Sequence, residues 1–188
     1  MESMLENGRL RKLFEHADAE IAEDVRVEGC RICGSALHRS DYDRKPRGFG
    51  ETNEFVKRIS FCCEQDGCRK RYTPPSLRFF GRRVYEGVIV VLLTAMTHGV
   101  NDRRAEELRE QLGLDRRTLE RWRQWWLETF PRSVFWRDVK GRFPKGIDHG
   151  ILPLSLVEEF GAMRVNGLCH LMKFLSPISV GRLVMAGA

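Results

Sequence analysis

The sequence has no apolar run long enough to cross a membrane. The longest run, Val88 to Met96, has nine residues, whereas a membrane-spanning helix needs about 20. The N-terminus (MESMLENGRLRK) also lacks the apolar core of a secretory signal peptide. We therefore expect a cytoplasmic protein with no membrane partner. In that reducing compartment, six cysteines indicate metal ligands or buried thiols before disulfides.

The sequence also lacks internal repeats, low-complexity segments and a cluster of catalytic groups. Its five histidines (positions 16, 38, 98, 149 and 170) are scattered. A small metal-dependent nuclease or recombinase would need histidines or acids gathered around its metal. We therefore expect no enzymatic activity. The acids of the C-terminal part are expected at the surface; they are Asp138, Asp148, Glu158 and Glu159.

Positive charge is concentrated in the middle of the chain. Residues 69–146 carry eighteen Lys and Arg against nine acids, and fifteen of these bases are arginine. Residues 1–25 are acidic, with a net charge of −4, and the remaining segments are close to neutral. Arginine makes forked contacts to phosphate and guanine. A concentration of this kind favours a surface that binds a polyanion over a solvated basic surface.

Two cysteine pairs have the spacing of a structural zinc site. The first pair is Cys30 and Cys33, followed by a glycine, and the second is Cys63 and Cys68, with a glycine in the intervening turn. Four thiolates can hold one tetrahedral zinc ion and leave no open position for chemistry. The spacing therefore predicts a structural Zn²⁺ site.

The third ligand could be Cys62 or Cys63. We choose Cys63, because it shares a strand face with Phe61 and leaves the shorter loop to the fourth cysteine. His38 is a possible substitute ligand but is more typical of a surface residue. Cys169 stands alone in an apolar segment, which indicates a thiol in the core.

Apolar periodicity predicts an α+β chain that is mostly helical. A single strand is expected from Phe55 to Cys63, where apolar and polar residues alternate, and a short one at Leu77–Phe80. Residues 132–150 are basic and contain Gly and Pro, which is typical of a connector. The predicted helices span about 4–24, 83–98, 102–112, 115–129, 154–162 and 167–175.

One central segment (AEELREQLGLDRRTLERW) has the pattern of a helix-turn-helix. Gly113 lies where the chain must reverse, and Asp115 can cap the second helix by accepting its free N–H groups. Leu119, Trp122 and Trp126 repeat at helical spacing and predict the buried face of that helix.

Basic residues follow the Asp115 cap on the opposite face. Arg116, Arg117 and Arg121 take positions from which a recognition helix reaches guanine in the major groove, and Thr118 is placed for a phosphate or a thymine methyl. Phosphate contacts carry no sequence information. We expect them from a basic strip before the apolar helix: Lys70, Arg71, Arg78, Arg82 and Arg83.

The order of these motifs resembles the N-terminal region of insertion-sequence transposases. The similarity covers about residues 28–130: Cys-x2-Cys, then F-x-C-x4-C-R-K-R-Y-T, an apolar helix and the helix-turn-helix. It implies a zinc ribbon over the four chosen cysteines, a recognition helix at Arg116–Arg121, and a role in transposition and DNA recombination at the bacterial nucleoid. The catalytic carboxylate domain of those enzymes has no counterpart in the 58 residues after Phe130.

These observations predict a zinc-containing, non-catalytic protein that binds double-stranded DNA and recognises element ends or targets beside a separate recombinase or transposase. A sequence-specific transcriptional regulator is the alternative, and a zinc-stapled protein-interaction module is a third reading. A homo-oligomer is left open. The expected segments are an N-terminal amphipathic helix (1–27), a zinc ribbon (28–82), a helix-turn-helix domain (83–131), a basic connector (132–150) and a C-terminal helical segment (151–188), which we expect to serve packing or protein contacts and not DNA.

Overall fold

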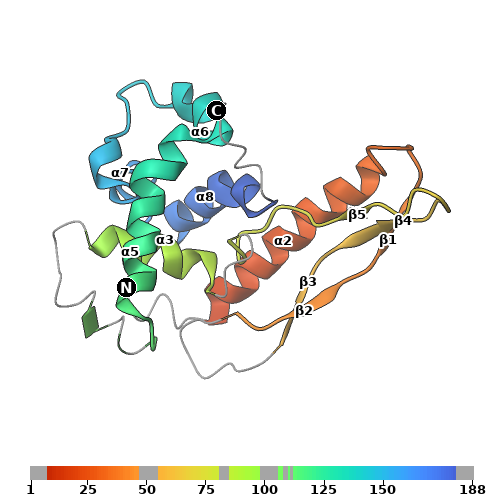
Figure 1. The fold of residues 1–188 in the computed structure, drawn as a ribbon, viewed down its shortest axis with the longest axis horizontal. Helices are drawn as coiled ribbons and strands as arrows, with labels where there is room; N and C mark the ends of the chain where they lie inside the picture. Colours follow the sequence, from red (N-terminus) through yellow and green to blue (C-terminus); the bar gives the residue numbers. More distant parts are fainter. Residues whose placement is uncertain are drawn as a thin grey trace.

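The structure has a helical body at one end and two small antiparallel sheets at the other (Figure 1). It is a computed structural model that describes residues 8–46, 55–80, 85–97, 106–107, 110 and 112–180. The predicted α+β class, with helix predominating, is confirmed. None of the helices in these ranges has the length and apolar character needed to span a bilayer.

The elements of the described chain have the following bounds. The α-helices are α2 (Gly8–Glu28), α3 (Gly87–Met96), α5 (Arg116–Gln124), α6 (Val134–Val139), α7 (Leu154–Glu159) and α8 (Val165–Leu175). A π-helical turn, η1 (Trp125–Thr129), continues α5. Short 3-10 turns are η2 (Phe130–Arg132), η3 (Lys140–Arg142), η4 (His149–Ile151) and η5 (Ser176–Val180). The strands are β1 (Leu37–Arg39), β2 (Tyr42–Arg44), β3 (Val56–Arg58), β4 (Phe61–Cys63) and β5 (Arg71–Tyr72).

The strands form two separate antiparallel sheets. We call these sheets and the turns around them (residues 29–46 and 55–73) the sheet region. One sheet has the order β1-β4-β5 and the other pairs β2 with β3. The single strand expected from Phe55 is therefore wrong: it is broken after Arg58. At the break the Asp41 carboxylate accepts the Ser60 N–H at 3.2 Å, which takes the place of a ladder bond. The strand expected at Leu77–Phe80 is reduced to one bridge, between Phe79 and Glu86.

Helix α2 contributes to both hydrophobic cores of the molecule. It was expected at 4–24 and continues to Glu28, where Gly29 follows with a positive φ of 74°. Its N-terminal half buries Leu10 and Phe14 in the large core of the helical body. Its C-terminal half buries Ala22 in the small core of the sheet region. The helix therefore connects the two ends of the molecule (Figure 1).

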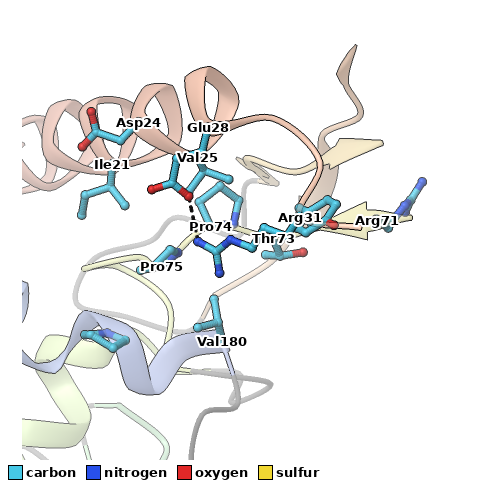
Figure 2. A pocket seen from close by; sticks show the side chains of 12 residues that line it. Ile21, Asp24, Val25, Glu28, Arg31, Arg71, Thr73, Pro74, Pro75 and Val180 are labelled. Carbon is cyan, nitrogen blue, oxygen red and sulfur yellow. Dashed lines mark hydrogen bonds and ion pairs between the residues drawn. The ribbon is translucent and has the colours of Figure 1, made fainter. Parts of the chain in front are cut away.

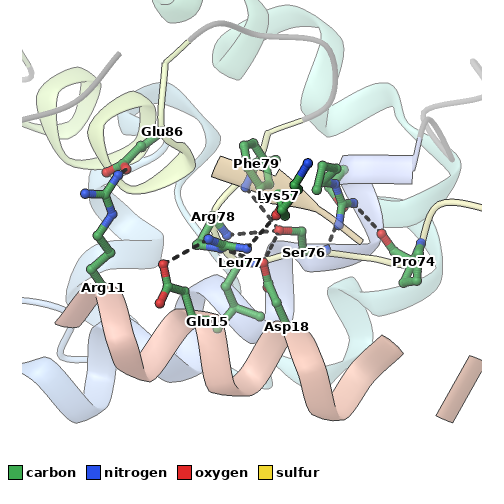
Figure 3. Close-up of polar contacts among 12 residues, drawn as sticks. Arg11, Glu15, Asp18, Lys57, Pro74, Ser76, Leu77, Arg78, Phe79 and Glu86 are labelled. Atoms are coloured by element: carbon green, nitrogen blue, oxygen red, sulfur yellow. Dashed lines mark hydrogen bonds and ion pairs between the residues drawn. The ribbon is translucent and has the colours of Figure 1, made fainter. Parts of the chain in front are cut away.

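A buried carboxylate fixes α2 to the chain that leads into α3 (Figure 3). Asp18 is 1% exposed. It accepts hydrogen bonds from the Ser76 hydroxyl at 2.6 Å, the Leu77 N–H at 2.6 Å and the Arg78 guanidinium at 3.1 Å. A buried charge needs such partners, so this network links α2 to the segment between the sheet region and α3.

The helical body is built around α3, whose residues from Gly87 to Ala95 are all buried. The apolar helix expected at 83–98 is thus confirmed, with shorter bounds. Aromatic side chains from α5 and the turns after it pack around α3. Trp125 and Trp126 form a T-shaped pair at 4.8 Å, and Phe130 lies 4.9 Å from Trp126, between ring centroids.

The segment 132–150 is an ordered part of the helical body, and its description as a connector is wrong. Ser133 caps α6 by accepting the Trp136 N–H at 3.1 Å, and the Trp136 side chain is buried. Its indole N–H donates to His149 at 3.0 Å. The two C-terminal helices expected near 154–162 and 167–175 are present as α7 and α8, and they pack in the same core as α3.

Candidate metal centre and basic surfaces

The four predicted cysteines converge at the end of the sheet region. Cys30 and Cys33 lie in the turn after α2, Cys63 ends β4, and Cys68 lies in the turn before β5. The turns are closed by backbone bonds from Gly34 N–H to the Cys30 carbonyl and from Cys68 N–H to the Gln65 carbonyl. All four sulfur atoms lie within 4.8 Å of one another. This group could hold a metal ion.

The sulfur separations suit a shared ion and not a disulfide. The Sγ atoms of Cys33 and Cys63 are 3.4 Å apart, and those of Cys30 and Cys68 are 3.7 Å apart. A disulfide requires about 2.05 Å. A tetrahedral ion with metal–sulfur bonds of about 2.3 Å would hold its sulfur ligands roughly 3.8 Å apart. The cluster needs only small adjustments to reach that geometry.

The electrostatic setting of the thiols also favours a bound cation. A hydrogen bond from Tyr72 lowers the pKa of Cys30 to about 6. The pKa of Cys33 is lowered by the Ser35 hydroxyl. Burial raises the pKa of Cys63 to about 12. Ionisation is therefore favoured at Cys30 and Cys33 and opposed at Cys63, and a positive ion at the centre would favour the thiolate form of all the ligands.

Tyr72 is a member of the site that the sequence did not single out. Its hydroxyl lies 3.3 Å from the Cys30 sulfur. The pKa of Tyr72 is raised, first by this hydrogen bond, so the phenol keeps its proton and is the donor. Hydrogen bonds of this kind orient a metal ligand and tune its basicity. The only signal in the sequence was an aromatic residue shortly after the second cysteine pair.

The alternative ligands lie outside the cluster. The Cys62 sulfur lies 3.6 and 3.7 Å from the carbonyls of Cys63 and Arg69. The His38 ring is bonded to Glu64 at 2.9 Å. Cys169 is partly buried on α8 in the helical body, and burial raises its pKa. The choice of Cys63 over Cys62 therefore agrees with the geometry.

A pocket of about 440 Å³ is lined in part by Tyr72, whose hydroxyl lies 3.3 Å from the Cys30 sulfur. Figure 2 shows this pocket. Its walls come from the C-terminal half of α2, from the chain between Arg71 and Pro75, and from η5. Glu28 and Arg31 form an ion pair of 3.0 Å at this pocket. Val180 of η5 also lines this pocket. The helical body therefore lies next to the C-terminal half of α2 here, in addition to the connection at Asp18.

The helix predicted at 115–129 is present as α5, which continues as η1. Gly113 has a positive φ of 57° at the reversal before it, and the Asp115 carboxylate accepts the Arg117 N–H at 2.7 Å. Both the turn and the cap are therefore confirmed. The predicted buried face is confirmed as well, because Leu119, Trp122 and Trp126 are all buried. Tyr85 holds Trp122 in a T-shaped contact with ring centroids 5.2 Å apart.

The basic residues of α5 lie on its exposed face. Arg116, Arg117 and Arg121 are exposed, and Thr118 is partly buried. Arg116 pairs with Glu120 at 3.4 Å, and Arg121 donates to the Thr118 hydroxyl at 2.8 Å. The first helix of the predicted helix-turn-helix lies largely outside the described residues.

The basic strip expected to contact phosphates does not form one surface. Lys70 and Arg71 are exposed at β5, at the far end of the molecule from α5 (Figure 1). The Arg78 side chain is only 10% exposed and is held by Asp18 and Glu15, each at 3.1 Å. This arginine is committed to the fold. Arg82 and Arg83 lie outside the described residues.

No known protein family, curated protein or solved structure matches this chain.

Proposed function

We propose that the chain is a zinc-containing, non-catalytic protein that binds double-stranded DNA through α5. In this proposal it recognises the ends or target of a mobile element and works beside a separate recombinase or transposase. The order of motifs along the chain, which resembles transposase N-terminal regions, supports the biological setting. The proposal has two parts, a metal site and a DNA-binding helix, which can be tested independently.

The metal part rests on the sulfur cluster. Four cysteine thiols with separations near those of a tetrahedral site are the ligand set that zinc prefers in structural sites. Purified protein should contain one zinc per chain. Cys63→Ser should lose the zinc and unfold the sheet region, because binding at a structural site contributes on the order of 10 kcal/mol to folding.

Cys62→Ser is the matched control for that variant. It removes a neighbouring thiol of β4 that is not part of the group of four and lies near the carbonyls of Cys63 and Arg69, so zinc content should stay at one. A metal-free wild-type chain with the same thermal stability in chelator would contradict the zinc site. Retention of zinc by Cys63→Ser but not by Cys62→Ser would reverse the ligand assignment.

The DNA part rests on one observation: Arg117 in the first turn and Arg121 in the last turn of the capped helix α5 are exposed, whereas Leu119 and Trp122 of the same helix are buried. Such an arginine can donate two hydrogen bonds to guanine, and each good pair is worth about 1–3 kcal/mol of discrimination. The hydroxyl of Thr118 would release Arg121 when a base replaces it as acceptor.

The test is binding to a selected duplex and to a scrambled duplex over a series of salt concentrations. Arg117→Ala and Arg121→Ala should each weaken the selected duplex by roughly 5- to 150-fold and relax the preference at one base pair. Arg26→Ala is the control, because Arg26 is exposed on α2 and already paired with Glu23 at 2.6 Å. Equal losses on both duplexes would remove the base-reading role, and no loss in either variant would remove α5 as the DNA-binding helix.

A further inference from the structure

We propose that the α6–η3 segment forms a second contact surface, which grips the phosphate backbone of double-stranded DNA next to the recognition helix. The surface consists of five basic residues: Arg132, Arg137, Lys140, Arg142 and Lys145. This inference rests on the DNA-binding function proposed above. It places the phosphate contacts, which the sequence analysis expected near β5, in a different part of the chain.

The first argument is the unbalanced charge of the segment. Residues 132–145 hold these five bases and a single acid, Asp138. All five bases are exposed. Within the described part of the chain, none of their side chains forms an ion pair or a hydrogen bond. Their positive charge is therefore available to an external anion.

Three basic residues of the sheet region differ in this respect. Arg39 pairs with Asp41 at 2.7 Å, Lys57 with Asp43 at 2.6 Å, and Arg69 with Asp66 at 2.7 Å. An external phosphate would have to compete with these carboxylates. Surface charge that is already compensated adds little to an attractive field. In the described part of the sheet region Lys45, Lys70 and Arg71 form no ion pair, whereas the segment 132–145 gathers five such basic residues within fourteen positions.

The second argument is that the segment is held rigidly. The Ser133 hydroxyl donates to the Phe130 carbonyl at 2.6 Å and accepts the Trp136 N–H at 3.1 Å. The Trp136 ring stacks on Phe143 with centroids 5.7 Å apart. The backbone that carries the five bases is therefore fixed before any ligand arrives, and preorganised groups lose less conformational entropy on binding.

The third argument is position. The α6–η3 segment follows α5 through η1 and η2, at the end of the molecule that carries α5 (Figure 1). From Arg116 to Thr129 the helix rises about 20 Å. If the helix enters the major groove end-on with its first turn, this length exceeds the groove depth of about 8.5 Å, so its far end lies outside the groove. The basic residues that follow the helix then contact the phosphate backbone of the DNA and not the edges of its base pairs. Phosphate contacts require only charge.

The experiment compares two triple variants of the full chain in duplex-binding assays. Lys140→Gln, Arg142→Gln and Lys145→Gln together remove three unpaired charges. Each phosphate contact contributes about 0.9 to the slope of log K against log[salt], so this variant should lower the slope by about 2–3 units on selected and scrambled duplexes alike. The base preference should stay unchanged.

The control triple removes the same net charge from paired sites: Arg26→Gln, Arg39→Gln and Lys57→Gln. Its slope should stay close to that of the wild type. A charge-retaining triple (Lys140→Arg, Arg142→Lys, Lys145→Arg) should also keep the wild-type slope. The single variants Lys140→Gln and Lys145→Gln, each expected to lower the slope by about one unit, give the answer if the triple variant is poorly folded.

The outcomes separate this surface from the function on which it rests. If the wild type binds duplexes and the α6–η3 triple keeps its slope, the surface does not contact DNA, which overturns this inference alone. If both glutamine triples lower the slope equally, only net charge matters and the surface is not specific. If the wild type does not bind duplexes at low salt, the proposed function falls, and this inference with it.

Discussion

Asp18 is a buried charge, and its loss should destabilise the fold strongly. In Asp18→Ala the Arg78 guanidinium and the Leu77 N–H lose an acceptor within a largely buried network. Removal of one partner from a buried ion pair costs about 3–5 kcal/mol. Urea denaturation should show this decrease in the free energy of unfolding. Asp24→Asn, at an exposed position of the same helix, should change it by less than about 0.5 kcal/mol. Similar losses in the two variants would contradict the role given to Asp18.

Glu86 should make stability depend on pH. Burial raises the pKa of Glu86 above its ordinary value of 4.5, and Arg11 at 3.7 Å opposes the shift only in part. The folded state therefore binds this proton more tightly than the unfolded chain. The free energy of unfolding should fall as pH rises from about 4.5 through the folded pKa.

Glu86→Gln removes that titration. The variant should match the wild type at pH 4 and become more stable than it as the pH approaches 7, because the glutamine carries no charge to bury. Thermal melts across this pH range provide the measurement. If the variant were less stable at pH 7 than at pH 4 by the same margin as the wild type, another group would be responsible.

For single residues, the sequence predicted the roles that depend on spacing along the chain. It missed the roles that depend on contacts with residues far away in the sequence. Alternation with Phe61 correctly distinguished Cys63 from Cys62. Tyr72 was missed because its bond to Cys30 joins positions 42 residues apart. Arg78 was expected to face DNA, because nothing local shows that Asp18, 60 residues upstream, neutralises it.

The contribution of the Asp115 N-cap to the stability of α5 can be tested by substitution. The Asp115 carboxylate satisfies the Arg117 N–H, and loss of an N-cap acceptor costs about 1 kcal/mol. Asp115→Ala should lower the free energy of unfolding by this amount, whereas Asp115→Asn, which keeps an acceptor, should lower it by much less. If both variants were neutral, the first turn of α5 would be held by its tertiary packing alone.

Element prediction succeeded for strongly periodic segments. Helices α3, α5, α7 and α8 all lie where apolar spacing placed them. The segment 132–150 was read as a connector because Gly and Pro interrupt it and its bases dominate the composition. Its helix, α6, has only six residues and depends on the burial of Phe135 and Trp136 in a core made by other helices. Short elements of this kind take their stability from tertiary contacts, which local periodicity does not contain.

The two ends of the molecule should be thermodynamically linked through α2. All four tryptophans (122, 125, 126 and 136) belong to the helical body, far from the cysteine cluster. Removal of metal should nevertheless lower the melting temperature reported by tryptophan fluorescence. Even about 2 kcal/mol transmitted through α2 would shift it by roughly 4–8 °C.

Cys63→Ser should reproduce the effect of chelator on this melt, and Cys62→Ser should not. A tryptophan transition at the same temperature with and without metal would mean that the sheet region and the helical body unfold independently. The division into five segments did not predict this linkage. Apolar periodicity shows that a helix has a buried face, but it does not show that the two halves of the helix are buried by different parts of the chain.

The shared helix α2 also constrains the order in which the chain can fold during synthesis. It is synthesised before the other helices of the described chain, yet Leu10 and Phe14 pack in a core that extends to Ile178. Its other half needs only residues up to Tyr72. At about 5–20 residues per second, the roughly 100 residues in between take about 5–20 s to make. During this interval the residues that bury the C-terminal half of α2 are already made, while Leu10 and Phe14 still lack the part of their core that α8 and η5 supply.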